Sequence, residues 1–174
     1  TTTIESVQED LDEIKEEVET LDAETEELQR ELDGINQKKT FFKKLRGSGL
    51  TAEDLQGSDR LGVFAGRIDA EGFRSGVGTD RFDIFGGESA SAVIYSEKYS
   101  GAVEKSLRSN SKKQFSVPET ELTGTCEQIC RKLDNRREKL QEEIDSVEGK
   151  KKNLAQKWNG KLYYIEDFLT QKIE

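Results

Sequence analysis

Histidine is absent from the 174 residues, and the sequence contains one proline and two cysteines. Without histidine, the chain lacks the commonest general base of enzymes and the commonest metal ligand. The two cysteines, Cys126 and Cys130, predict neither a disulfide scaffold nor a closed zinc site. We therefore expect a protein that is not an enzyme, with no catalytic residue, no metal site and no cofactor.

Long hydrophobic runs are also absent. No stretch of 18 apolar residues occurs, so no segment is expected to span a bilayer, and no secretory signal is recognisable. Hydrophobic residues make up 32% of the chain and charged residues 36%, which is too polar for one compact core and typical of long solvated helices. The net charge of -9 argues against nucleic acid and anionic membrane surfaces as partners. Because heptad patterns run close to both ends, we expect a fragment of a longer protein.

A heptad repeat occupies residues 1–45. Its two core series are Ile4, Leu11, Val18, Thr25, Leu32 and Lys39, and Val7, Ile14, Leu21, Leu28, Ile35 and Phe42. Alternating spacings of three and four predict one apolar seam that faces a partner helix in a coiled coil. Thr25 and Lys39 are interpreted as tolerated polar core positions. Thr2 and Glu5 have the spacing of a capping box at the helix start.

A second long helix is predicted for residues 123–174, beginning near Thr125, which has capping-box spacing with Gln128. Its less regular apolar stripe comprises Ile129, Leu133, Leu140, Ile144, Val147, Leu154, Trp158, Leu162, Ile165 and Leu169. Neither helix is apolar enough to be stable alone, because each exposes a narrow stripe that needs a partner.

Opposite charges indicate how these helices pair. Residues 1–40 hold fourteen acidic and four basic side chains, a net charge of -10, whereas residues 132–162 hold nine basic and six acidic ones, a net of +3. Individual surface ion pairs are weak, but their signs discriminate between partners. The distribution favours an antiparallel hairpin within one chain over a parallel homodimer, in which two acidic faces would repel.

The segment 46–122 has a different pattern, with clustered glycines and alternating apolar residues. Short strands are predicted at Leu61–Gly66, Arg81–Phe85, Ser91–Ser96 and Gln114–Val117. Helices are predicted at Asp69–Gly76 and Ser100–Asn110, with Ser100 as the cap, and a turn of helix at Thr51–Leu55. The order β-α-β-β-α-β predicts a small ferredoxin-like lobe. The fold class is therefore α+β, a long antiparallel two-helix coiled coil with this lobe at its tip and Phe41, Phe42 and Leu45 at the junction.

Few features of the sequence could carry chemistry. The Gly62-x-x-x-Gly66 and Gly76-x-Gly78 patterns match no phosphate-binding loop and are interpreted as structural glycines. The cysteines lie four residues apart near a helix N-terminus that could lower a thiol pKa, but we interpret them as packing residues. A basic stretch of Lys105, Arg108, Lys112 and Lys113 is the candidate surface for an acidic partner, with a solvated surface as the alternative.

Short motifs resemble a known family. They are Leu61-Gly-Val-Phe-Ala-Gly-Arg-Ile68, Ala92-Val-Ile-Tyr95 and Phe115-Ser-Val-Pro-Glu119, the last shortly before a long helix capped by Thr-Gly-Thr. Together with the layout of nearly the whole chain, they resemble the cytoplasmic region of subunit I of archaeal and bacterial A/V-type ATPases, the counterpart of V-ATPase subunit a. These motifs are largely structural and identify a fold element better than an activity.

The resemblance implies a stator role on the cytoplasmic side of a membrane-bound complex. Such subunits join a membrane-embedded half, which carries the proton path, to peripheral stalks. The implied partners are a peripheral-stalk heterodimer and other ATPase subunits, with the remainder of the same chain in the membrane and no direct membrane contact from this fragment. The alternative is a coiled-coil scaffold with a globular hinge of the SMC type, although such hinges are usually larger and dimerise.

Overall fold

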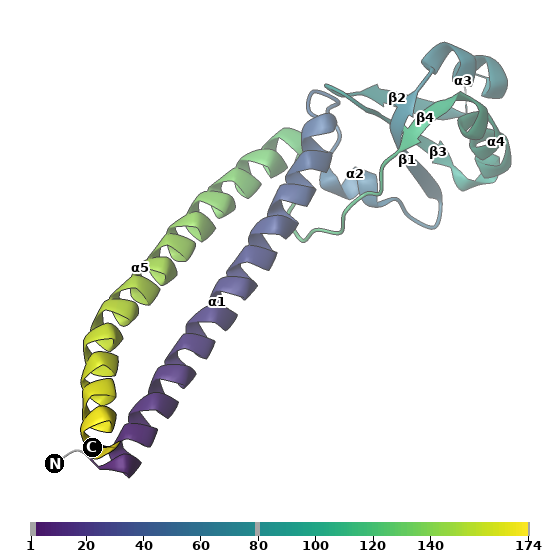
Figure 1. Cartoon of the computed structure of the whole chain (residues 1–174). Helices are drawn as coiled ribbons and strands as arrows, with labels where there is room; N and C mark the ends of the chain where they lie inside the picture. The colour runs from purple at the N-terminus through teal and green to yellow at the C-terminus, as the bar shows by residue number, and fades with distance from the viewer. Residues whose placement is uncertain (1–2, 79–80, 174) are drawn as a thin grey trace. The chain divides into compact units, whose positions relative to one another are not determined.

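The computed structural model describes residues 3–78 and 81–173 (Figure 1). Two long helices, α1 (Ile4–Lys44) and α5 (Cys126–Ile173), enclose the other elements in the sequence. Those elements are α2 (Ala52–Gln56), β1 (Leu61–Ile68), α3 (Ala70–Val77), β2 (Phe82–Gly86), β3 (Ser91–Ser96), the 3-10 helix η1 (Glu97–Tyr99), α4 (Ser100–Asn110) and β4 (Ser111–Gln114). The protein is thus helix-rich with a small antiparallel sheet, an α+β fold.

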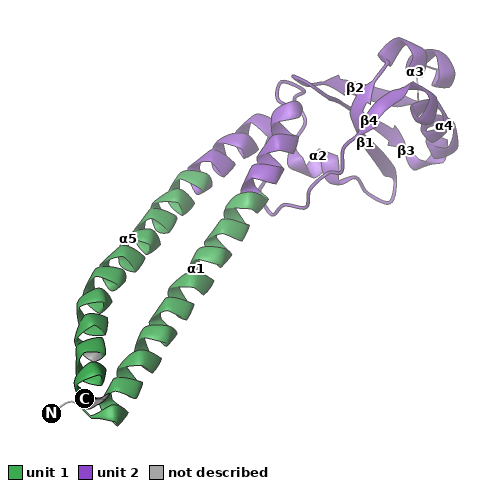
Figure 2. Ribbon diagram, viewed as in Figure 1, with its two compact units in different colours: residues 1–34, 137–174 green, residues 35–136 purple. Residues whose placement is uncertain are grey.

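The chain divides into two compact units (Figure 2). The first comprises residues 1–34 and 137–174 and contains most of α1 and of α5. The second contains residues 35–136 and holds the sheet, the short helices and the adjoining turns of α1 and α5. Both long helices are continuous through the boundary between the units.

In the first unit, α1 and α5 run antiparallel. Lys161 Nζ lies 3.2 Å from an Asp10 oxygen and Lys151 Nζ lies 3.0 Å from an Asp22 oxygen, so rising numbers in one helix meet falling numbers in the other. The indole Nε1 of Trp158 donates a hydrogen bond to Glu17 at 3.1 Å. These contacts join the acidic first helix to the basic second one, with the signs that the charge distribution predicts.

The two heptad series of α1 are buried to different extents. Val7 is 4% exposed, whereas Ile4, Leu11 and Val18 of the other series are 69%, 38% and 42% exposed. The two series are therefore unequally buried at the start of α1, and the single seam formed by both stays a prediction. Thr25 is accommodated because its hydroxyl donates to the Leu21 carbonyl at 2.9 Å. The capping box predicted at Thr2 lies outside the described residues.

The sheet of the second unit has the strand order β2-β3-β1-β4, and all neighbouring strands are antiparallel. The predicted strand Ser91–Ser96 is confirmed as β3. The prediction of a fourth strand at Gln114–Val117 is wrong, because pairing with β1 involves Ser111–Gln114 and only one further backbone bond, from Phe115 to Ala65. This edge strand is polar and exposed, so it has no apolar pattern for the sequence to reveal.

Helices α3 and α4 pack on one face of the sheet and enclose the core of the lobe. Its buried side chains are Phe64, Phe73, Val77, Val93, Tyr95, Val103 and Leu107. The inward orientation predicted for Val103 and Leu107 is confirmed. The prediction that Ser100 caps α4 is wrong. Ser100 is the first residue of the helix, because the preceding η1 places Tyr99 at the cap position.

Two glycines of the apparent phosphate-loop patterns, Gly62 and Gly66, are packing positions. A Cβ on Gly62 would meet the Tyr95 ring, and a Cβ on Gly66 would meet the Lys113 backbone. Side chains and a neighbouring strand occupy the space beside these glycines, so the interpretation as structural residues is confirmed.

Candidate partner-binding surface

The four basic residues singled out in the sequence lie on two adjacent elements of the second unit. Lys105 and Arg108 are on α4, and Lys112 and Lys113 are on β4, which follows α4 directly. All four are exposed. They do not share one face, however. Gln114 lines a pocket with Arg108 on the side of the sheet that α4 covers, and the alternation along β4 places Lys113 on the opposite face.

The pocket beside Arg108 has a volume of about 290 Å³. Its lining comprises Val63, Phe64, Tyr95, Glu104, Leu107, Arg108, Ser111 and Gln114. Burial raises the pKa of Tyr95, and the nearby carboxylates of Glu104 and Glu97 raise it further. The phenol therefore stays protonated at neutral pH, and the pocket offers one carboxylate and one guanidinium rather than an activated nucleophile.

A second group of cations surrounds Phe115 on the other face of the sheet. Lys44, at the end of α1, and Lys113 on β4 place their Nζ atoms 4.3 and 5.3 Å from the ring centroid, and the Arg67 guanidinium of β1 lies 6.0 Å away. Lys44, Arg67 and Phe115 were not predicted as site residues. Their proximity depends on the pairing of Arg67 with Lys113 across β1 and β4, which a single sequence does not show.

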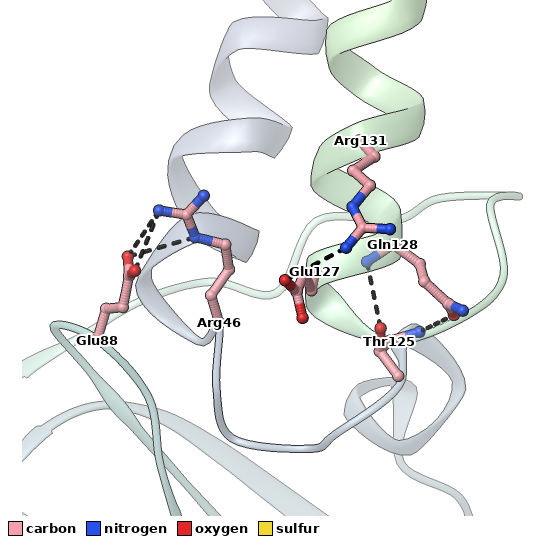
Figure 3. Close-up of polar contacts among 6 residues, drawn as sticks. All are labelled: Arg46, Glu88, Thr125, Glu127, Gln128 and Arg131. Carbon is pink, nitrogen blue, oxygen red and sulfur yellow. Dashed lines mark hydrogen bonds and ion pairs between the residues drawn. The ribbon is translucent and has the colours of Figure 1, made fainter.

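The lobe is fastened to the end of α1 by the β2–β3 hairpin. The backbone N–H groups of Ser89 and Ala90 donate to the Lys44 carbonyl, at 3.1 and 3.2 Å, and that of Glu88 donates to the Arg46 carbonyl at 3.1 Å. The Arg46 guanidinium also donates to both carboxylate oxygens of Glu88, at 3.0 to 3.3 Å (Figure 3). The hydrogen bond to Glu88 raises the pKa of Arg46. This bidentate contact between guanidinium and carboxylate favours one orientation of the hairpin.

The predicted junction residues are buried within the second unit. Phe42 and Leu45 are fully buried, Phe41 is 6% exposed, and the two phenylalanine rings meet edge to face with centroids 5.2 Å apart.

Lys39 pairs with Asp134 at 2.5 Å, so this polar position of the heptad is held by an ion pair between α1 and α5.

A capping box begins α5 next to this attachment. The N–H of Gln128 donates to the Thr125 hydroxyl at 3.2 Å, and the N–H of Thr125 donates to the Gln128 side-chain oxygen at 2.9 Å (Figure 3). The predicted capping box is thus confirmed, and Thr51 and Asp54 form a second one at the start of α2. Both satisfy N–H groups that a helix start otherwise leaves unpaired.

The variant Thr125→Ala is expected to lower the free energy of unfolding by about 1 kcal/mol, because α5 loses the side-chain acceptor of its cap. Thermal unfolding followed by circular dichroism measures the loss. Thr20→Ala is the matched control, because the Thr20 hydroxyl bonds only to the Glu16 carbonyl within the exposed middle of α1. Equal unfolding temperatures for the two variants would show that the cap contributes nothing.

Both cysteines are buried packing residues in the second unit. Cys126 is 2% exposed and Cys130 is 3% exposed, and both are free thiols. Burial raises the pKa of Cys126 to about 11 and also raises that of Cys130. The Cys126 thiol is therefore not activated, because burial outweighs the hydrogen bond with Ser48 that lowers its pKa. Within residues 3–78 and 81–173, no cluster of side chains suited to a metal ion is present.

Alkylation of Cys126 by iodoacetamide at pH 8 is expected to be slow in the native protein, since a pKa of about 11 leaves about one thiol in a thousand ionised. The rate should rise more than about a hundredfold in denaturant. The unfolded thiol ionises near its ordinary pKa of 9.0, so the stabilisation from the buried neutral thiol is fully present below pH 9. It is lost as the pH rises towards 11. Rapid native alkylation, measured by mass spectrometry, would contradict this burial.

A comparison with solved structures finds a similar fold in the cytoplasmic N-terminal domain of subunit I, a homologue of subunit a, of a V-ATPase. The TM-score is 0.61 and the sequence identity is 20%. The match covers 93% of this chain and 56% of that chain, so the present chain spans just over half the length of the structure it resembles. Identity at this level establishes the fold alone. No protein-family model and no curated protein sequence matches the chain.

The described helices also bear on the relation to a membrane. Among the residues that the structure describes, none of the helices combines the length and the apolar character that a bilayer span requires.

Proposed function

We propose that this chain is a non-catalytic stator fragment of a rotary A/V-type ATPase. The observation that carries the proposal is the likeness in fold, over 93% of the chain, to the cytoplasmic N-terminal domain of a V-ATPase subunit I. The fragment would link the membrane sector to the peripheral stalks and support proton transport without doing chemistry itself. The proton path and the membrane-embedded part would lie in the remainder of the same polypeptide.

The proposed architecture is an outgoing coiled-coil helix at 1–45, a distal lobe at 46–122 and a return helix at 123–174. The ion pairs Asp10–Lys161 and Asp22–Lys151 support the antiparallel coiled coil. The strand order β2-β3-β1-β4 with α3 and α4 on one face supports a ferredoxin-like lobe.

A paired-helix arm suits a part that carries load. At 1.5 Å per residue, the 41 residues of α1 extend for about 60 Å. Backbone hydrogen bonds along each helix, and side-chain packing between the two, resist bending better than a flexible linker does. The hydrogen bonds between the β2–β3 hairpin and the end of α1 would then pass force from the arm to the lobe.

The proposed partners are a peripheral-stalk heterodimer and other subunits of the ATPase, on the cytoplasmic side of the membrane. Lys105, Arg108, Lys112 and Lys113 are the proposed contact residues on the lobe. They are exposed cations on a chain of net charge -9, so an acidic partner surface would select this part of the molecule.

Calorimetric titration of the whole chain with a purified A/V-type peripheral-stalk heterodimer tests the proposal. Binding is expected at low salt and should weaken as salt increases, because the contact is electrostatic. A variant with all four contact residues replaced by glutamine should bind the heterodimer more weakly than the unmodified chain does at the same salt concentration. Lys150→Gln with Lys152→Gln, two exposed lysines of the first unit, is the control. Absence of binding at every salt concentration would reject the stator role, and dimerisation through the lobe would favour a scaffold hinge instead.

A further inference from the structure

Two cations are directly opposite each other at the edge of the sheet. Arg67 of β1 and Lys113 of β4 are cross-strand partners in the antiparallel register, so their side chains leave the same face. Like charges in this position repel and destabilise strand pairing. Lys44 adds a third cation, since it shares the Phe115 ring with both. In the described part of the chain, none of the three forms an ion pair with a carboxylate. A negatively charged group bound beside these three cations would therefore be stabilised by all of them.

The same place offers backbone hydrogen-bonding groups. β4 is an end strand of the sheet, paired only with β1 within the described residues. Lys112, Lys113 and Gln114 are exposed, so their outer edge is accessible. An accessible strand edge is a template for an additional strand, in which backbone bonds supply affinity and alternate side chains supply specificity.

We propose that the outer edge of β4 binds an extended acidic segment of a partner protein as an added strand. Carboxylates on one face of that segment bind Lys113, Lys44 and Arg67, and the half-exposed Phe115 ring packs against the stems of the same side chains. The added charge relieves the repulsion between Arg67 and Lys113. This inference rests on the proposed docking role of the lobe, but it does not depend on which complex supplies the partner.

A protein segment fits this site better than another polyanion. Nucleic acid and anionic lipid surfaces carry extended negative charge, which the net charge of -9 repels at long range. A short acidic segment needs only a few carboxylates beside the cluster. It also satisfies the free N–H and C=O groups of β4 with its own backbone, which a phosphodiester chain does not do.

Fluorescence anisotropy with the whole chain and a labelled twelve-residue peptide of alternating glutamate and threonine tests the inference. Binding is expected to fall as salt increases. The Glu→Gln peptide tests the charge requirement, and a peptide N-methylated at every second residue tests the strand geometry. Each should bind at least about tenfold more weakly than the acidic peptide. Equal binding of either one would overturn the proposal, as would absence of binding by the acidic peptide or its displacement by micromolar DNA or anionic phospholipid vesicles.

The double variant Arg67→Gln with Lys113→Gln should reduce peptide affinity by about tenfold or more, whereas Lys150→Gln with Lys152→Gln should change it less than about twofold. Removal of the like-charge pair should leave the thermal unfolding temperature unchanged or higher, so lost binding cannot be attributed to misfolding. Equal affinity of the double variant and the unmodified chain would overturn the site. Failure of the acidic peptide to bind, with stalk-heterodimer binding retained, would overturn this inference alone. Peptide binding without stalk binding would instead reject the stator role alone.

Discussion

Replacement of Phe73 by alanine is expected to lower the stability of the lobe by about 3–5 kcal/mol. The Phe73 ring is completely buried and meets the Phe82 ring edge to face, with centroids 4.6 Å apart. Alanine would leave a cavity among side chains of α3, α4 and the sheet, and a core of this size has little stability to lose. Hydrogen exchange of the backbone amides of β1 and β3 should accelerate by about a hundredfold or more.

Tyr163→Ala is the matched control for this variant. Tyr163 is an aromatic residue of α5 that is 75% exposed, so its loss should change stability by less than about 0.5 kcal/mol. Unchanged exchange in β1 and β3 of Phe73→Ala would show that the ring does not hold the helices to the sheet.

Gly87→Ala is expected to destabilise the attachment of the hairpin to α1 by about 1–3 kcal/mol. A Cβ at this position would lie 2.5 Å from both the Leu45 Cα and the Lys44 carbonyl oxygen, which are backbone atoms with little freedom to move. The hairpin must shift away, and the hydrogen bonds of Glu88 and Ser89 to the helix end lengthen as it does. The expected result is a lower unfolding temperature, with faster amide exchange at residues 88–90.

The preceding residue supplies the control. A Cβ on Gly86 would meet no atom within 4 Å, so Gly86→Ala adds the same methyl group without a clash. Its unfolding temperature should stay within about 2 °C of that of the unmodified chain. If both variants lost stability equally, the close approach of Gly87 to α1 would not be the cause.

The long helices could be predicted because their signals are local. Three-four spacing, cap residues and charge all lie within a few turns of one another, and Thr125 with Gln128 places the start of α5 correctly. The unequal burial of the two heptad series could not be predicted in this way. Burial depends on which side of α1 the other helix contacts. The heptad repeat does not give that side, because Leu11 and Ile14 are both core positions in it.

In the lobe, the buried strand β3 was predictable and the edge strand β4 was not. The middle of β3 is a run of mostly buried apolar residues that the sequence reveals, whereas the polar edge strand β4 is defined by its backbone pairing. The same distinction limits prediction of the candidate site. Lys112 and Lys113 are adjacent in the sequence and could be found as a basic run. Arg67 lies near Lys113 only because β1 and β4 pair in one register, and Lys44 lies near the sheet only because the β2–β3 hairpin bonds to the end of α1.

The single tryptophan gives the first unit a built-in optical probe. Trp158 is 3% exposed, its indole donates to Glu17, and Lys157 and Lys161 lie 5.0 and 4.5 Å from the ring centroid. Because no other tryptophan occurs in the 174 residues, the emission spectrum reports the environment of one point between α1 and α5. Separation of the helices would hydrate the indole and shift its emission to longer wavelength. Mechanical strain on the arm could thus be followed by fluorescence without attaching a dye.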